Sequence, residues 1–161
     1  MCTGEELIFL PYFLLTIKII MSTQLSLKSL LVPSKQVEIE YPGLMGFTIT
    51  VAFLSRETLV DIRKKATKTV YKNRQPIEEL NDDAFLQHYV RESIKGWKGL
   101  KLSYLEQLAP VDLSDQDDLD AELEFSEENA LFLMKASANF DAFISETVSD
   151  LGNFQKSSSK K

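Results

Sequence analysis

Few side chains in this sequence are of types that carry out chemistry, and their spacing does not suit a catalytic or metal site. His88 is the one histidine, and no second ligand or nucleophile lies near it along the chain. Cys2 is the one cysteine, so the chain cannot form an internal disulfide or a cysteine-based zinc site. We therefore expect no cofactor and no metal, and we expect His88 to be a surface or packing residue.

Carboxylates are plentiful, but their positions indicate roles other than catalysis. Glu127 and Glu128 open an expected helix, where the helix dipole favours negative charge. Residues 112–120 superficially resemble a calcium loop, yet they lack the central glycine and a correctly spaced terminal glutamate. A solvated linker and a weak cation site both stay open for this run. General acid–base catalysis needs a pocket, and no phosphate loop or nucleophile elbow is present, so we do not expect an enzyme.

Charge is unevenly distributed over the 161 residues, whose formal net charge is -6. Residues 55–75 carry seven basic and two acidic side chains, whereas residues 106–150 carry thirteen acidic side chains and one basic side chain. An acidic balance disfavours a chain-wide footprint for nucleic acid or an anionic membrane. The length fits one ordinary domain.

Residues 1–20 contain an apolar run that invites comparison with a signal peptide or a membrane anchor. Two glutamates precede the run where a signal peptide would be basic, and Pro11 and Lys18 interrupt it. The run is also shorter than the roughly 20 apolar residues of a spanning helix. We expect residues 1–20 to be an upstream extension of the natural start, with a membrane-associated segment and an added core helix as the alternatives.

Beyond this segment, the hydrophobic pattern predicts an α+β fold in which an N-terminal β-hairpin packs on a mostly helical domain. Apolar and polar side chains alternate over residues 37–41 and again over residues 47–53, which is the period of half-buried strands. Residues 42–46 supply proline and glycine for the turn. A lone hairpin is marginal in water, so helices must cover it.

The first expected helix begins at Ser55 and is broken at Gln75-Pro76. Its apolar face has helical spacing and consists of Leu59, Ile62, Ala66 and Val70. Its opposite face carries the basic candidates Arg56, Arg63, Lys64 and Lys68. Three interpretations stay open for this basic face: a solvated surface, a docking surface for an acidic protein, and a nucleic-acid-binding surface.

A second expected helix begins at Asn81, and Gly96 ends it in the manner of a C-terminal cap. Trp97 then falls where the chain turns. The large ring of Trp97 either packs over the hairpin or a helix, or anchors a partner.

The expected organisation continues with an acidic linker or insert over residues 101–124, which opens with a short helix. A C-terminal helical segment follows over residues 125–154, and a disordered tail over residues 155–161. Residues 21–100 hold the hairpin and the first helices, and residues 21–154 are expected to form one folded unit.

The C-terminal segment is expected to contain two helices, one capped by Ser126 and one running from about Asn139 to Gly152. Their apolar faces either belong to the core or line a groove for a partner. The residues concerned are Phe125, Leu133, Phe140 and Phe143.

This order of elements resembles that of tail assembly chaperones of long-tailed bacteriophages and prophages, over about Ser34 to Phe154. The likeness rests on a hairpin around Tyr41-Pro42-Gly43, a Ser55-Arg56-Glu57 helix start, the tryptophan turn over residues 94–100, and Phe125-Ser126-Glu127-Glu128-Asn129 after an acidic linker. The insert over residues 101–123 and the N-terminal extension depart from the pattern.

The resemblance implies a non-catalytic factor of the host bacterial cytoplasm that is absent from the mature virion. Such a factor binds and solubilises the tape measure protein and helps to recruit tail tube protein, in this family often through a longer, frameshifted form. Together with the acidic balance of the chain, it favours protein partners over a membrane or nucleic acid, and it is compatible with a homo-oligomer. In this interpretation the groove candidates are Phe125, Leu133, Phe140 and Phe143, and Trp97 is a further candidate for partner binding.

Two alternatives belong to other classes of function. One is a minor tail or head–tail joining protein, which would be found in purified particles. The other is a nucleic-acid-binding regulator that uses the basic face over residues 56–74, whose binding would fall steeply with salt.

Overall fold

The computed structural model describes residues 26–30 and 35–155. The chain divides into two units, residues 1–33 and residues 34–161. In the first unit, α2 (Leu27–Leu30) exposes both Leu27 and Leu30. The boundary falls inside residues 21–154, which were expected to form one folded unit.

The apolar run of residues 1–20 and most of the predicted tail lie outside the described residues. Within the described part of the chain, no helix is both long and apolar enough to cross a membrane.

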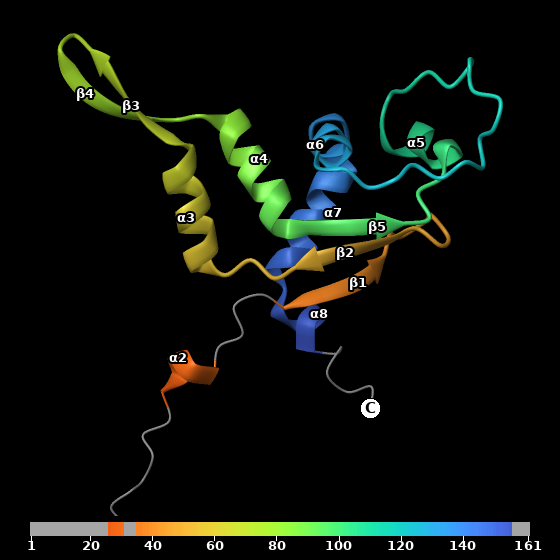
Figure 1. Cartoon of the computed structure of the whole chain (residues 1–161), viewed down its shortest axis with the longest axis horizontal. Helices are drawn as coiled ribbons and strands as arrows, with labels where there is room; N and C mark the ends of the chain where they lie inside the picture. The colour runs from red at the N-terminus through yellow and green to blue at the C-terminus, as the bar shows by residue number, and fades with distance from the viewer. Residues whose placement is uncertain (1–25, 31–34, 156–161) are drawn as a thin grey trace, which may run out of the picture. The chain divides into compact units, whose positions relative to one another are not determined.

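The second unit is α+β, as the hydrophobic pattern predicts, and its centre is a three-stranded antiparallel sheet (Figure 1). β1 (Gln36–Glu40) pairs with β2 (Thr48–Ala52), and the register places Val37 opposite Val51. β5 (Ile94–Lys98) pairs with the other edge of β2 and gives the order β1-β2-β5. The predicted N-terminal hairpin is confirmed.

Two glycine turns meet at one end of this sheet. Gly99 has a φ of +73°, and a Cβ atom at this position would lie 2.1 Å from the carbonyl oxygen of Gly46. Only glycine combines this backbone conformation with so close an approach. The turn between β1 and β2 is thereby seated against the segment that follows β5.

Between the neighbouring strands β2 and β5, the chain makes a long excursion. It contains α3 (Arg56–Ala66), β3 (Thr67–Lys72), β4 (Gln75–Leu80) and α4 (Asp82–Ser93). Ser55 caps α3 by accepting a hydrogen bond from the N–H of Thr58, and Asn81 caps α4 in the same way. Both predicted helix starts are confirmed.

The prediction that the first helix continues to Gln75-Pro76 is wrong. The helix ends at Ala66, and residues 67–80 form a second antiparallel hairpin. Asn73 and Arg74 have φ values of 53° and 64°, as a two-residue type I′ turn requires. Val70 satisfied the helical spacing, but β-branched residues around it favour a strand.

The prediction that Gly96 caps a helix and that Trp97 lies at a turn is also wrong. α4 ends at Ser93, and the N–H of the next residue, Ile94, still donates to the carbonyl of Val90. The chain passes directly into β5, where Trp97 is opposite Ile49. Trp97 is therefore a strand residue facing the core.

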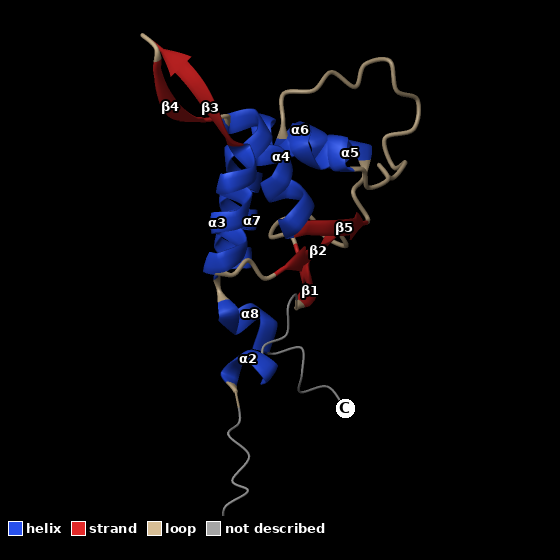
Figure 2. Ribbon diagram, turned by 60° about the vertical axis from the view of Figure 1, so that its left-hand side comes forward, coloured by secondary structure: helices blue, strands red, loops and turns tan. Residues whose placement is uncertain are grey.

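Four helices follow β5: α5 (Leu102–Leu108), α6 (Glu127–Ala136), α7 (Ala138–Ser149) and α8 (Leu151–Gln155). Ser126 caps α6 as predicted, whereas Gly152 lies inside α8 instead of closing the preceding helix. α7 packs against β2 and α6, and α8 packs against β1 (Figures 1 and 2).

The acidic linker is tied back to the fold over its second half. The N–H groups of Leu102 and Ser103, at the start of α5, donate to the carbonyls of Ala121 and Leu119. The N–H of Leu123 donates to the carbonyl of Leu100 at 2.7 Å. The linker thus supplies the cap that α5 lacks in its own side chains.

Candidate protein-binding surfaces

Four of the five predicted partner-binding residues lie in one chain of aromatic contacts. Trp97 makes edge contacts with Phe125, at 5.0 Å between ring centroids, and with Phe47, at 6.3 Å. Tyr41 continues the chain from Phe47 to the two remaining aromatic candidates. These are Phe140 and Phe143. The sequence thus identified residues that are close in space.

These aromatic residues are brought together by the core. Phe140 is fully buried, Leu133 is 1% exposed, and Trp97 is 7% exposed. Phe125 and Phe143 are half-buried and pack against the same core cluster. The core interpretation therefore describes Trp97, Leu133 and Phe140, because a partner cannot reach these side chains without unfolding the protein.

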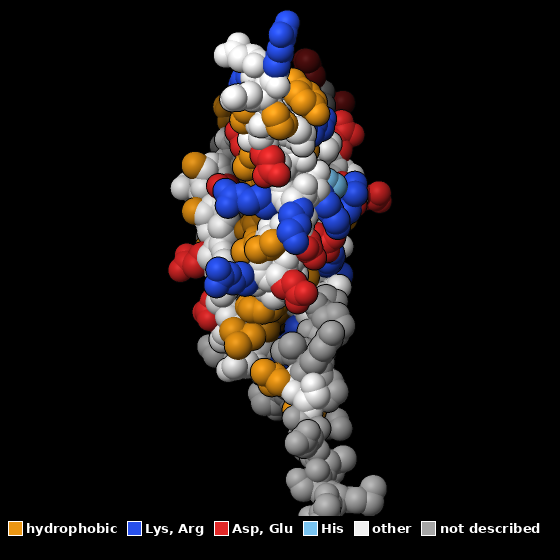
Figure 3. Space-filling view, turned by 90° about the vertical axis from the view of Figure 1, so that its left-hand side faces the viewer, with side chains coloured by type: hydrophobic (Ala, Val, Ile, Leu, Met, Phe, Trp, Pro, Cys, Tyr) orange, Lys and Arg blue, Asp and Glu red, His pale blue; other side chains and the backbone are white. Residues whose placement is uncertain are grey.

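The predicted basic face is exposed but is divided between two elements. Arg56, Arg63 and Lys64 lie on α3, whereas Lys68 lies on β3. Figure 3 shows Lys and Arg side chains spread along this side of the molecule, with hydrophobic side chains between them. Two of the exposed hydrophobic residues of α3 and the hairpin are Val60, at 44%, and Tyr71, at 76%.

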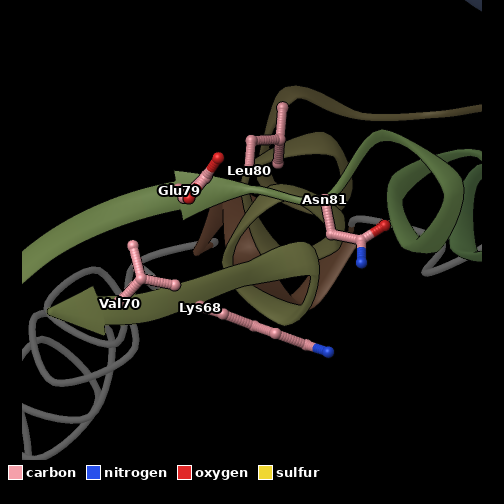
Figure 4. A pocket seen from close by; sticks show the side chains of 5 residues that line it. All are labelled: Lys68, Val70, Glu79, Leu80 and Asn81. Atoms are coloured by element: carbon pink, nitrogen blue, oxygen red, sulfur yellow. The ribbon is translucent and has the colours of Figure 1, made fainter. Parts of the chain in front are cut away.

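The hairpin of β3 and β4, which we call the ribbon, stands beyond the ends of α3 and α4 in both ribbon views (Figures 1 and 2). Its strands pack chiefly against each other. A shallow pocket of about 280 Å³ lies at its base, and Figure 4 shows the five lining side chains. They are Lys68, Val70, Glu79, Leu80 and Asn81.

A larger groove of about 460 Å³ lies between α4 and α6. Its apolar lining comes from Val90 on α4 and Leu131 on α6, and charged side chains surround them. Phe132, the residue after Leu131, is 53% exposed. It lies one turn from Glu128, which also lines the groove, so it stands beside the rim.

Two ion pairs bridge α4 and α6, one among the residues that line the groove and one about a helical turn beyond them. Lys135 Nζ lies 2.6 Å from Asp83 Oδ1, and Arg91 Nη2 lies 3.2 Å from Glu127 Oε2. Asp83 lies in the first turn of α4 and pairs with the last turn of α6, whereas Arg91 lies in the last turn of α4 and pairs with the first turn of α6. The helices are therefore antiparallel.

All four charges in these pairs also match the dipole of their own helix, with acids in first turns and bases in last turns. The side chains are exposed, so each pair contributes little to stability. The ion pairs fix how the two helices align, and they place both positive and negative charges beside the groove. The hydrogen bond from Lys135 lowers the pKa of the Asp83 carboxyl, and the positive charge of Lys135 acts in the same direction.

Three carboxylates of the acidic linker, those of Asp112, Asp118 and Asp120, accept hydrogen bonds or form ion pairs. Asp112 accepts hydrogen bonds from the backbone and the hydroxyl of Ser114, which lower the pKa of Asp112. Asp120 pairs with Lys101 at 3.0 Å. Within residues 26–30 and 35–155, no group of three or more His, Cys, Asp or Glu side chains is arranged to hold a metal ion.

Sequence reasoning missed the ribbon and the exposure of Phe132. The ribbon had a readable signal, because Thr67, Thr69 and Tyr71 alternate with Lys68 and Val70 in a strand-like pattern. Phe132 had none, because α6 is apolar over five consecutive residues and its exposed face cannot be identified from periodicity.

Comparison of the chain with protein-family models, with curated proteins and with solved structures found no match.

Proposed function

We propose that this protein is a non-catalytic tail assembly chaperone that binds and solubilises a tape measure protein and helps to recruit tail tube subunits. It would act in the host cytoplasm and be absent from the mature virion. The sequence resemblance suggests the class, and the groove between α4 and α6 is the observation that supports a helix-binding role.

A tape measure protein is a very long, largely helical chain with exposed apolar stripes. Docking of an amphipathic helix places its apolar stripe in a groove and its charged flanks against the rim. Leu131 is half-buried and provides the apolar lining that a bound helix can reach, whereas Val90 is 1% exposed and belongs to the floor of the groove. The exposed ring of Phe132 extends the contact beyond the rim. The two ion pairs supply charges of either sign for the flanks of the bound helix.

The proposed contact residues differ from those that the resemblance implied. Leu133 and Phe140 are buried in the core and do not line the groove. Leu131 and Phe132 immediately precede Leu133 on α6, and they face outward to different degrees. The proposed binding surface thus lies on α4 and α6, whereas Trp97 lies on β5 and both Phe140 and Phe143 lie on α7.

The test is co-expression of the full chain with the long helical protein encoded beside it. We expect the long protein to stay soluble and to co-purify in a complex that contains many copies of this chain. The variant Phe132→Glu should lose this complex, because it places a charge on the proposed contact. Met45→Glu is the matched control, since Met45 is 85% exposed and lies at the hairpin turn.

Two outcomes would overturn the proposal. One is precipitation of the long protein to the same extent with and without this chain. The other is recovery of this chain in purified virions at a fixed stoichiometry, which a structural tail protein would show.

A further inference from the structure

The ribbon has one strand edge that is open and one that is blocked. Asn81 donates its N–H to the carbonyl of Ala66 at 2.9 Å across the base of the ribbon. Successive residue pairs in an antiparallel ladder alternate between hydrogen-bonded and non-hydrogen-bonded. Because Ala66 and Asn81 form a hydrogen-bonded pair, the next pair, Thr67 and Leu80, is not hydrogen-bonded, and every second pair after it is the same. The backbone N–H and C=O groups of the residues in these pairs point away from the partner strand. They are Thr67, Thr69 and Tyr71 on β3, and Pro76, Glu78 and Leu80 on β4.

The two edges differ in what they offer a further strand. Pro76 has no N–H, so the outer edge of β4 is interrupted. On β3, the N–H of Thr67 is used by the carbonyl of Lys64, but no hydrogen bond among the described residues uses the backbone of Thr69 or Tyr71. The edge of β3 therefore has free donors and acceptors.

The side chains of β3 define the composition that a further strand needs. Lys68, Val70 and Lys72 share one face of the ribbon. On its paired side, β3 already meets Ile77 opposite Val70 and Glu79 opposite Lys68. Lys72 Nζ also lies 3.6 Å from Glu79 Oε2.

A strand added at the open edge of β3 would place its own side chains beside these three on the same face of the ribbon. A matching strand therefore has an apolar side chain beside Val70 and acidic side chains beside Lys68 and Lys72. A second copy of β3 fits poorly, because it would bring lysines beside lysines.

We infer that the open edge of β3 binds an extended segment of a partner protein in which two acidic residues flank an apolar residue in alternating register. The segment adds as a third strand to the ribbon. Two-stranded hairpins are marginally stable in water, and a third strand with a shared apolar face stabilises them. This surface is separate from the groove between α4 and α6, so the inference does not rest on the proposed function.

The test uses the full chain and a short synthetic peptide. Every second residue of the peptide is threonine, and the positions between the threonines are glutamate, isoleucine and glutamate in that order. Binding is followed by amide chemical shifts in an isotope-labelled sample. We expect the largest changes at Thr69 and Tyr71, together with slower amide exchange at both positions. A peptide with lysine in place of glutamate should bind at least about tenfold more weakly.

Two proline variants separate the edges. Thr69→Pro removes the outward N–H of β3, whereas Glu78→Pro removes the outward N–H of the residue directly opposite on β4. Both insert a proline at an outward position of the same pair, so both impose a similar cost on the ribbon. Only Thr69→Pro should abolish peptide binding.

If proline unfolds the ribbon in both variants, the double variant Lys68→Gln and Lys72→Gln keeps the backbone intact and should weaken binding by about tenfold or more. Equal binding of the acidic and basic peptides would overturn the inference. So would shift changes confined to β4, or self-association of the chain through β3 in the absence of peptide.

Discussion

The indole Nε1 of Trp97 donates a hydrogen bond to the carbonyl oxygen of Leu123 at 2.9 Å. Trp97 lies in β5 and Leu123 lies at the end of the acidic linker, so the bond joins the sheet to the segment that leads into α6. The ring of Trp97 also packs between Phe47 and Phe125. The side chain of Trp97 thus packs in the core and also holds the end of the linker against the sheet.

Trp97→Phe tests this double role. The variant keeps an aromatic ring but leaves the partly buried carbonyl of Leu123 without its donor and leaves a small cavity. We expect a loss of about 2–4 kcal/mol in the free energy of unfolding, measured by urea denaturation with circular dichroism. The exposed control Met45→Ala should change it by less than about 0.5 kcal/mol. An equal effect of the two variants would contradict the role of Trp97.

Gly99→Ala tests the contact between the two turns. A methyl group at Gly99 would meet the carbonyl oxygen of Gly46 at 2.1 Å, in addition to the cost of a positive φ. We expect a loss of at least about 2 kcal/mol in thermal or urea unfolding. Gly43→Ala is the matched control. Gly43 has a φ of +86°, but no atom lies within 4 Å of the place that its Cβ would occupy, so only about 1 kcal/mol should be lost.

Phe140→Ala and Phe132→Ala distinguish a core residue from a contact residue. Phe140 is fully buried, so its truncation should cost about 3–5 kcal/mol of unfolding free energy. Phe132 is 53% exposed, and its truncation should cost less than about 1 kcal/mol while weakening the proposed complex. Urea denaturation measures the first effect and co-purification the second. A large stability loss from Phe132→Ala would assign this ring to the core.

The ion pair between Lys135 and Asp83 predicts a defined pH dependence. Because Lys135 lowers the pKa of Asp83, the pair stabilises the fold above the unfolded carboxyl pKa of about 3.9. This contribution is lost as the pH falls through the lower folded pKa. Carbon NMR titration of Asp83 should show the lowered pKa, and Lys135→Met should raise it toward its usual range. Lys64→Met on α3 is the control and should leave the titration of Asp83 unchanged.

Arg74→Gly should stabilise the ribbon. Arg74 has a φ of 64°, which costs a non-glycine residue about 1 kcal/mol, and an Asn-Gly pair is the favoured type I′ turn. We expect amide exchange at Val70 and Ile77 to slow by about threefold while global unfolding is unchanged, because the ribbon opens locally. Faster exchange in this variant would contradict the assigned turn.

Local chemistry made much of the fold predictable. Ser55, Asn81 and Ser126 are side chains that cap helices, and all three do so here. The first hairpin could be predicted because apolar and polar side chains alternate on either side of Pro42 and Gly43. This alternation arises because one face of each strand packs on the core. These signals are confined to a few neighbouring residues, so a sequence can reveal them.

The ribbon could have been read from its β-branched residues, but the helical spacing of Val70 concealed it. The parts that could not be predicted depend on distant partners. The exposed face of α6 is the clearest case, because this helix is apolar on most sides. Which of Phe132 and Leu133 faces solvent depends on how α4, α7 and the sheet surround the helix, and no local pattern encodes that arrangement.

The hydrogen bond between Asn81 and Ala66 closes the ribbon at its base. The ends of residues 67–80 therefore lie next to each other, where α3 ends and α4 begins. Insertions, replacements or a complete exchange of this loop would leave α3, α4 and the sheet with their present contacts. The ribbon is thus a replaceable module, so the binding edge that we infer for it could change while the rest of the protein keeps its fold.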